Sequence, residues 1–205
     1  MLLSNYHNKY NAEAGCDEVG RGCLAGPVVA AAVILPKKFT HPYLTDSKKL
    51  SANKRAELVD VIKSESIAWA VAECSPEEID QVNILNASFW AMHKAIDQLV
   101  QKPDFLLIDG NRFTSYQKIK HECIIKGDSK YFSIAAASIL AKEYRDDLMR
   151  KLAELHPHYA WERNVGYPTK QHRAGIQKFG ITEHHRKSFQ LLPKQREIFE
   201  NHGNG

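Results

Sequence analysis

The sequence has no apolar run long enough to cross a membrane. None of its 205 residues belongs to an uninterrupted apolar stretch near the about 18 residues that a membrane span needs. The N-terminal segment 1–10 is polar and lacks the apolar core that a signal peptide carries. We therefore expect a protein without a membrane segment that resides in the cytoplasm.

Cysteine is scarce as well, and the chain has no internal repeat and no low-complexity linker. Its four cysteines form no CxxC pair and no zinc-binding spacing, which argues against a zinc finger and against a disulfide-bonded scaffold. We expect reduced, mostly buried thiols. The length suits one domain with a substantial core, with room for a small appendage.

Neither sign of charge dominates the sequence. The 28 Lys and Arg against 24 Asp and Glu give a net charge of +4, which is mildly basic and compatible with a polyanionic partner. From Trp161 onward, eight basic residues accompany four acidic ones. This distribution alone does not separate a nucleic-acid-binding face from an ordinary solvated surface.

The stretch 14–28 combines two adjacent carboxylates with several glycines. Asp17 and Glu18 lie where an apolar run breaks into glycines, with Arg21 between two of them, and residues 28–35 are again apolar. This pattern predicts a strand, a glycine turn and a second strand. The two carboxylates then lie at the mouth of the turn, where freed backbone N–H groups allow a cation and a phosphate to bind together.

The hydrophobic pattern predicts an α/β fold. Strands are expected at 12–19, 27–35, 66–74, 105–108 and within 116–125. Helices are expected at 52–63, at 76–82, from Asn83 or Asn86 to about 101, at 133–155, at 171–179 and at 194–201. Ser51 and Ser75 are the predicted N-caps of the first two helices. The simplest architecture is a mixed five-stranded sheet flanked by helices (1–155), with a helical C-terminal appendage (156–205).

Acidic residues recur at the predicted strand ends. Asp17 and Glu18 end the first strand, Asp109 follows the buried run 105–108, and Asp128 follows another strand. Loops at strand ends converge in α/β sheets, and carboxylate oxygens are natural ligands of Mg²⁺ and Mn²⁺. These four acids are therefore candidate catalytic and metal-binding residues for phosphodiester hydrolysis with two cations.

Two features of this acidic set bear on which of its residues bind a cation. Adjacent strand residues point to opposite faces, so Asp17 and Glu18 can face one cation only if the strand twists or bends, which Gly20 makes easy. Asp17 is the better-placed ligand, and Glu18 serves through its side chain, its carbonyl or both. Taken alone, Asp109 followed by Gly110 is typical of an ordinary turn.

The glycines also suggest a dinucleotide-binding turn, but their spacing does not fit. The order is Gly20-x-Gly22-x-x-x-Gly26 rather than GxGxxG, and Pro27 with a β-branched run follows where a helix is required. Two acids just before the turn would also repel a pyrophosphate. A dinucleotide-dependent oxidoreductase is therefore a weak alternative.

The motifs in this order resemble the signature of ribonuclease HII, the type 2 ribonuclease H of bacteria. The resemblance begins with Gly15-Cys16-Asp17-Glu18-Val19-Gly20-Arg21-Gly22 and Leu24-Ala25-Gly26-Pro27-Val28. It continues through Asp46-Ser47-Lys48-Lys49-Leu50, Ile108-Asp109-Gly110, Lys126-Gly127-Asp128, Ala136-Ala137-Ser138-Ile139-Leu140-Ala141-Lys142, Gly166-Tyr167-Pro168-Thr169 and His185-Arg186-Lys187-Ser188-Phe189. These blocks span nearly the whole chain, and the first of them is specific.

The resemblance implies a ribonuclease H-like fold and a metal-dependent endonuclease. Such an enzyme hydrolyses the RNA strand of RNA–DNA hybrids, and it cuts duplex DNA on the 5′ side of an embedded ribonucleotide, leaving 3′-hydroxyl and 5′-phosphate ends. The resemblance implies that the four acids bind Mg²⁺ or Mn²⁺. It also implies that Gly20, Arg21 and Gly22 read the 2′-hydroxyl through their backbone, and that Tyr167 packs on the adjoining deoxyribose. Both roles make chemical sense, since glycine permits close approach and the 2′-hydroxyl distinguishes RNA from DNA.

The remaining basic residues receive looser roles. We expect phosphate contacts from Lys48 and Lys49 in the cleft, and similar contacts from Arg145, Arg186 and Lys187. A solvated loop explains the two lysines equally well. No histidine shows metal-ligand spacing along the chain, so none is assigned a role.

The sequence favours a monomeric nuclease over three alternatives. A non-catalytic nucleic-acid-binding module would keep the basic tail, which we expect to bind substrate, but would cut nothing. The oxidoreductase would bind a cofactor without a divalent metal. Ribonuclease HIII normally carries an additional N-terminal substrate-binding domain, and the short segment before Asp17 favours ribonuclease HII over it.

Overall fold

The computed structural model describes Ser4 and residues 10–44 and 51–193. The strands are β1 (Glu13–Val19), β2 (Val28–Ile34), β3 (Ala68–Cys74), β4 (Phe105–Asp109) and β5 (Lys120–Ile124). The α-helices are α1 (Ala52–Glu65), α2 (Pro76–Val82), α3 (Ile84–Gln98), α4 (Phe132–Leu155), α5 (Trp161–Asn164) and α6 (Lys170–Phe179). Two short 3-10 helices are η2 (Gly127–Ser129) and η3 (Pro157–Tyr159). The predicted helix at 194–201 lies outside the described residues.

The five strands form one mixed sheet in the order β3-β2-β1-β4-β5, which confirms the predicted sheet. The central strand β1 pairs antiparallel with β2 and parallel with β4, while β3 and β5 occupy the edges. Because β1 and β4 are parallel and Cys16 lies opposite Ile108, the residues that follow at each strand end are neighbours. These residues are Asp17 and Asp109, so the topology places two predicted site residues side by side.

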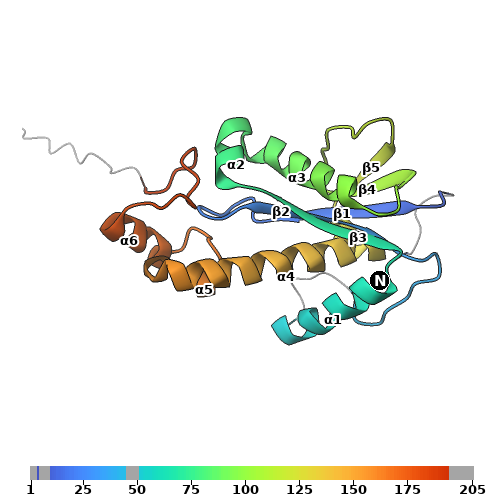
Figure 1. Ribbon diagram of the computed structural model, residues 1–205, viewed down its shortest axis with the longest axis horizontal. Coiled ribbons are helices and arrows are strands. Elements are labelled where there is room, and N and C mark those ends of the chain that lie inside the picture. The colour runs from blue at the N-terminus through green and yellow to red at the C-terminus, as the bar shows by residue number, and fades with distance from the viewer. Residues whose placement is uncertain (1–3, 5–9, 45–50, 194–205) are drawn as a thin grey trace, which may run out of the picture.

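Helices cover both faces of the sheet, as Figure 1 shows with α2 and α3 on one side and α1 and α4 on the other. Alternate residues of β2 serve the two layers. Val28 and Ala30 belong to the core under α3, whereas Val29 and Ala31 belong to the core under α1 and α4. A strand that is buried on both faces explains the nearly unbroken apolar sequence of β2. No helix among the described residues is both long and apolar enough to cross a membrane.

The helix starts follow the predicted capping residues. Ser51 accepts a hydrogen bond from the Lys54 N–H at 3.3 Å and caps α1. Ser75 and Glu78 form a reciprocal capping box at the start of α2. The open choice between two asparagines for the start of α3 is settled for Asn83, whose side chain accepts two backbone N–H bonds.

Gly15 lets α4 lie directly against the central strand. A Cβ atom at this position would lie 2.3 Å from the Ser133 carbonyl carbon and 2.4 Å from the Ile134 nitrogen, both of them backbone atoms of α4. No rotamer change relieves such a contact, so the strand and the helix would have to separate. The small buried residues Ala135, Ala136 and Ala137 near the start of α4 serve the same close packing.

We expect Gly15→Ala to lower the free energy of unfolding by about 3 kcal/mol, at the upper end of the cost of overpacking, because backbone must move. Gly22→Ala is the matched control, since its Cβ would meet only the Tyr167 ring, at 3.8 Å. Urea unfolding of both variants measures the difference. Equal stability of Gly15→Ala and the wild type would contradict the close packing of β1 against α4.

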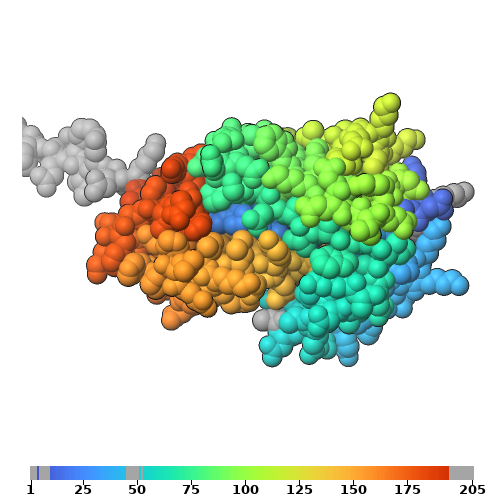
Figure 2. Space-filling view, in the orientation of Figure 1, coloured from blue at the N-terminus to red at the C-terminus, as the bar shows by residue number. Residues whose placement is uncertain are grey.

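The described part of the C-terminal segment packs against the turn between β1 and β2. Leu24 and Ala25 from this turn share a core with Met149 of α4, Trp161 of α5 and Ile176 of α6. Figure 2 shows the red and orange atoms of these late segments beside blue atoms from the first part of the chain. The short helix α5 was not predicted, and it completes this third core.

Candidate active site

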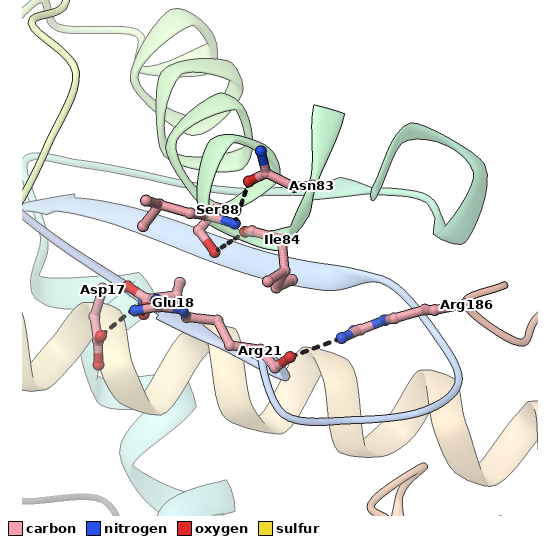
Figure 3. Close-up of polar contacts among 8 residues, drawn as sticks. Asp17, Glu18, Arg21, Asn83, Ile84, Ser88 and Arg186 are labelled. Carbon is pink, nitrogen blue, oxygen red and sulfur yellow. Dashed lines mark hydrogen bonds and ion pairs between the residues drawn. The ribbon is translucent and has the colours of Figure 1, made fainter. Parts of the chain in front are cut away.

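Asp17 lies near the end of β1 on the face that α4 covers, and Figure 3 shows its side chain directed from the strand toward that helix. Asp17 is only 6 % exposed. The Glu18 N–H donates to Asp17 Oδ1 at 2.7 Å, and the Ser138 side chain of α4 is a further hydrogen-bond partner. The carboxylate is therefore held in one orientation by the strand and the helix together.

Glu18 points toward the other face, as the alternation of a strand requires. It lines a cavity of about 280 Å³ together with Ser88 and Phe89 of α3. The Arg21 guanidinium donates to Glu18 Oε1 at 3.3 Å. The side chains of Asp17 and Glu18 therefore point to opposite faces of β1, as predicted for neighbouring strand residues. Near the end of the strand, however, both of them line one cavity.

A second cavity, of about 210 Å³, brings the acids together. Its lining includes Asp17, Glu18 and Asp109, with Ser138 and Lys142 from α4 and Tyr167 from the C-terminal segment. Asp109 and Glu18 line both cavities. Carboxylates from both faces of β1 can line the same cavity because they lie near the end of the strand. In the middle of the strand, the sheet would separate side chains on opposite faces.

Asp109 and Asp128 are linked by the backbone of η2. The Gly127 N–H donates to Asp109 Oδ1 at 2.7 Å, and Asp128 follows directly as a buried residue. Asp128 does not line the cavity of the other three acids. Three of the four predicted acids thus line one cavity. The fourth, Asp128, directly follows Gly127, whose N–H binds Asp109.

Burial and mutual repulsion dominate the electrostatics of this site. Burial raises the pKa of Asp17 well above its usual range, and the nearby charges of Glu18 and Asp109 raise it further. Burial also raises the pKa of Glu18 to about 7, although Arg21 opposes that shift. Crowded, buried carboxylates favour a compensating cation, and an all-oxygen donor set suits Mg²⁺ or Mn²⁺. These residues fit a divalent metal.

Two fully buried arginines hold the glycine turn from behind. Arg186 donates to the carbonyls of Gly20 at 2.7 Å, Arg21 at 2.9 Å and Gly26 at 3.0 Å, and Figure 3 shows the bond to Arg21. Arg145 of α4 donates to the carbonyls of Ala25, Pro27 and Val165 at 2.7–3.0 Å. Five carbonyls of the turn at 20–27 are therefore drawn toward the protein interior.

The predicted phosphate contacts of Arg145 and Arg186 are therefore wrong. Both residues are 0 % exposed, and their donors are engaged by backbone carbonyls rather than directed toward a substrate. Lys187 is exposed, as a phosphate contact requires. Lys48 and Lys49 lie outside the described residues, so their predicted contacts remain predictions.

Tyr167 reaches the acidic cavity from the C-terminal segment. Gly166, just before it, has φ +87° and lies so close to the turn that a Cβ would be 2.5 Å from the Ala25 carbonyl oxygen. The Tyr167 ring lies beside Gly22, and the residue as a whole is 43 % exposed. The fold thus places the predicted turn at 20–22 and the predicted tyrosine at the same site.

Histidines form two groups that spacing along the chain did not reveal. His156, Glu183 and His184 have ligand atoms within 4.8 Å of one another, but none of them lines the acidic cavity. His172 and His185 are buried and in contact with each other. The first group joins the end of α4 to the segment 180–185, and the second joins α6 to the same segment. Both sets of contacts depend on the tertiary fold, so spacing along the chain does not reveal them.

Comparison with known proteins identifies the family. The family model described as Ribonuclease HII matches residues 14–192. The chain belongs to the ribonuclease HII family. Ribonuclease HII of Parabacteroides distasonis is 61 % identical over 194 residues, covering 95 % of this chain and 98 % of the relative. Ribonuclease HII of Bacteroides thetaiotaomicron is 60 % identical over 191 residues, covering 93 % of this chain and 96 % of the relative.

A solved structure agrees on the fold. The ribonuclease H2 of Pyrococcus horikoshii superimposes with a TM-score of 0.75 at 23 % identity, covering 88 % of this chain and 95 % of that one. Membership of the ribonuclease HII family makes the protein a metal-dependent nuclease with endoribonuclease activity on RNA–DNA hybrids. The oxidoreductase and the ribonuclease HIII alternatives are thereby set aside.

Proposed function

We propose that this protein cleaves the RNA strand of RNA–DNA hybrids and also cuts duplex DNA on the 5′ side of a single embedded ribonucleotide. Asp17, Glu18, Asp109 and Asp128 are the proposed ligands of Mg²⁺ or Mn²⁺. One observation carries the proposal: three carboxylates, that of buried Asp17 and those of half-buried Glu18 and Asp109, border a cavity that Tyr167 also lines. A site for cations and a site for a sugar are therefore contiguous.

The chain's own residues supply the orientation that this chemistry needs. Bound divalent cations would supply an activated water and stabilisation of the leaving 3′-oxygen, which yields 3′-hydroxyl and 5′-phosphate ends. The Glu18 N–H fixes one oxygen of Asp17, and the Gly127 N–H fixes one oxygen of Asp109. Ligands held in place before the metal binds need little reorganisation, which favours catalysis.

The turn at 20–22 and Tyr167 are the proposed readers of the sugar. Carbonyls of Gly20 and Arg21 are bound to Arg186 in the interior, so this backbone is fixed where a 2′-hydroxyl would approach. Gly22 has no side chain to block that approach. The exposed ring of Tyr167 would pack on the adjoining deoxyribose, where a 2′-hydroxyl fits poorly.

The broader setting of the enzyme is also proposed. We assign the appendage (156–205) to substrate binding, because its described part carries Tyr167 and packs on the glycine turn. Lys48 is a proposed phosphate contact. The cytoplasm is the proposed location, in keeping with four free cysteines, and the proposed oligomeric state is a monomer, which size-exclusion chromatography with light scattering measures.

The decisive experiment uses a labelled DNA duplex with one ribonucleotide, incubated with the protein and Mg²⁺ or Mn²⁺. We expect a cut on the 5′ side of the ribonucleotide, no cut in an all-DNA duplex, and no cut by Asp109→Asn. The Asp109→Asn variant keeps the acceptor for the Gly127 N–H but loses the charge that binds a cation.

The same experiment separates the nuclease from a module that only binds nucleic acid. Tight binding of the duplex without any product, and without a difference between the wild type and Asp109→Asn, would support the binding module. Cleavage of all-DNA duplex at the same rate would contradict the proposed reading of the 2′-hydroxyl while leaving the metal site in place.

A further inference from the structure

Behind Tyr167 lies a buried chain of hydrogen bonds through two histidines. His172 of α6 is 0 % exposed, and its Nδ1 lies 2.9 Å from the Tyr167 carbonyl oxygen. The Trp161 indole N–H donates to His172 Nε2 at 3.0 Å, and His185 Nε2 lies 3.2 Å from the same atom. At the far end, the Thr182 N–H donates to His185 Nδ1 at 2.9 Å.

The donors at both ends fix the tautomer of each ring. An indole nitrogen only donates and a carbonyl oxygen only accepts. His172 must therefore accept at Nε2 and carry its proton on Nδ1, which donates to Tyr167. The backbone N–H of Thr182 likewise requires an acceptor at His185 Nδ1, so that His185 carries its proton on Nε2. The indole N–H and the His185 Nε2–H then share the single lone pair of His172 Nε2 in a three-centre hydrogen bond, at 3.0 Å and 3.2 Å.

Both rings are neutral in this arrangement. A second proton on His172 would oppose the indole N–H, and a second proton on His185 would oppose the Thr182 N–H. Burial lowers the pKa of His172. Burial, followed by the influence of His172, lowers the pKa of His185 to about 4. The hydrogen-bond geometry and the burial of the two rings thus both favour neutral imidazoles.

The hydrogen bonds through His172 and His185 connect the two parts of the proposed sugar-reading site. At one end His172 binds the backbone of Tyr167. At the other end His185 forms a bridge with Ala25 in the glycine turn, and the N–H of the following Arg186 donates to the Leu24 carbonyl at 2.9 Å. A shift of either histidine would alter the distance between the tyrosine and the turn.

We infer that His172, supported by Trp161 and His185, is a positioning residue that sets Tyr167 against the glycine turn and thereby favours cleavage at a single embedded ribonucleotide. This inference rests on the proposed function of Tyr167. At a single ribonucleotide the adjoining sugar is deoxyribose, on which the ring packs. In an all-RNA strand that sugar carries a 2′-hydroxyl, so the tyrosine contributes less.

Two conservative variants separate the two sides of the imidazole. His172→Asn retains a donor near the position of Nδ1, whereas His172→Gln retains a polar group near Nε2 and loses the donor to Tyr167. The measured quantity is the ratio of kcat/KM for a single-ribonucleotide duplex to kcat/KM for an RNA–DNA hybrid. A general structural defect would lower both values and leave the ratio unchanged.

We expect His172→Gln to lower this ratio by roughly fivefold or more, as the loss of one hydrogen bond predicts, and His172→Asn to stay within about twofold of the wild type. Tyr167→Ala should lower the ratio at least as much as His172→Gln. Adding His172→Gln to Tyr167→Ala should have no further effect on the ratio, because coupled residues are non-additive.

The outcomes distinguish the inference from the proposed function. An unchanged ratio in His172→Gln, with a lowered ratio in Tyr167→Ala, would overturn the positioning role alone. An unchanged ratio in Tyr167→Ala would overturn both. Should a variant not fold in a thermal melt, ¹⁵N NMR of wild-type histidine decides: protons on His172 Nδ1 and His185 Nε2 support the inference, and the opposite tautomers overturn it.

Discussion

Asp17→Asn is expected to abolish cleavage and, at the same time, to make the metal-free protein more resistant to heat. The two effects have one cause. Asp17 is buried beside two other carboxylates, and burial and repulsion both disfavour its charged form. Asparagine has the same shape and keeps an acceptor for the Glu18 N–H, but it carries no charge to repel its neighbours or to bind a cation.

The expected sizes differ for the two effects. Loss of a charged metal ligand should lower kcat/KM by about 1000-fold or more, which corresponds to several kcal/mol of transition-state stabilisation. Relief of the repulsion should add about 1 kcal/mol of stability, or a rise of about 2–4 °C in Tm for a chain of this size. The charge that the reaction requires thus destabilises the metal-free fold.

Thermal melts with EDTA and with excess Mg²⁺ measure this trade-off. Mg²⁺ should raise the Tm of the wild type because it binds the folded state. The rise in Tm for Asp17→Asn should be smaller. Asp147→Asn is the matched control, because Asp147 is an exposed acid of α4 that pairs with Lys151. A lower Tm for Asp17→Asn than for the wild type in EDTA would contradict the repulsion argument, and retained cleavage would remove Asp17 from the ligands.

The acids could be predicted from the sequence because their positions follow from local rules. An apolar run of strand length ends at Asp17 and another at Asp109, and parallel strands bring such ends together. The alternation of a strand also predicted that Asp17 and Glu18 can face one cation only if the strand twists or bends. Glu18 lines the cavity beside α3 without Asp17, and both acids line the second cavity. Helix starts were predictable where a side chain caps them, as at Ser75 and Asn83.

The support behind the site could not be predicted in this way. Arg145 and Arg186 look like surface charges in the sequence, and their partners in the turn lie 118–166 residues away. No periodicity or spacing links an arginine to distant backbone carbonyls. The same holds for His172 and His185, whose contact depends on how α6 and the segment at 180–185 fold over the turn.

Arg186→Met is expected to be the most destabilising single change at this site, and to lower cleavage even where the protein stays folded. The carbonyls of Gly20, Arg21 and Gly26 would lose their guanidinium donors in the interior. Leaving buried polar groups without partners costs about 1–3 kcal/mol each, so we expect a loss of about 3–5 kcal/mol. Displacement of the turn by about 1 Å would cost about 100-fold in kcat/KM.

Arg186→Lys tests whether charge or geometry matters here. Lysine keeps the positive charge but presents a single nitrogen in place of the planar fork that reaches three carbonyls. We therefore expect it to lose nearly as much stability and activity as Arg186→Met, while Lys187→Met, which removes an exposed charge next door, should change little. Urea unfolding and cleavage of the single-ribonucleotide duplex measure both quantities. A lysine variant that melts and cleaves like the wild type would show instead that one buried positive charge is enough to hold the turn.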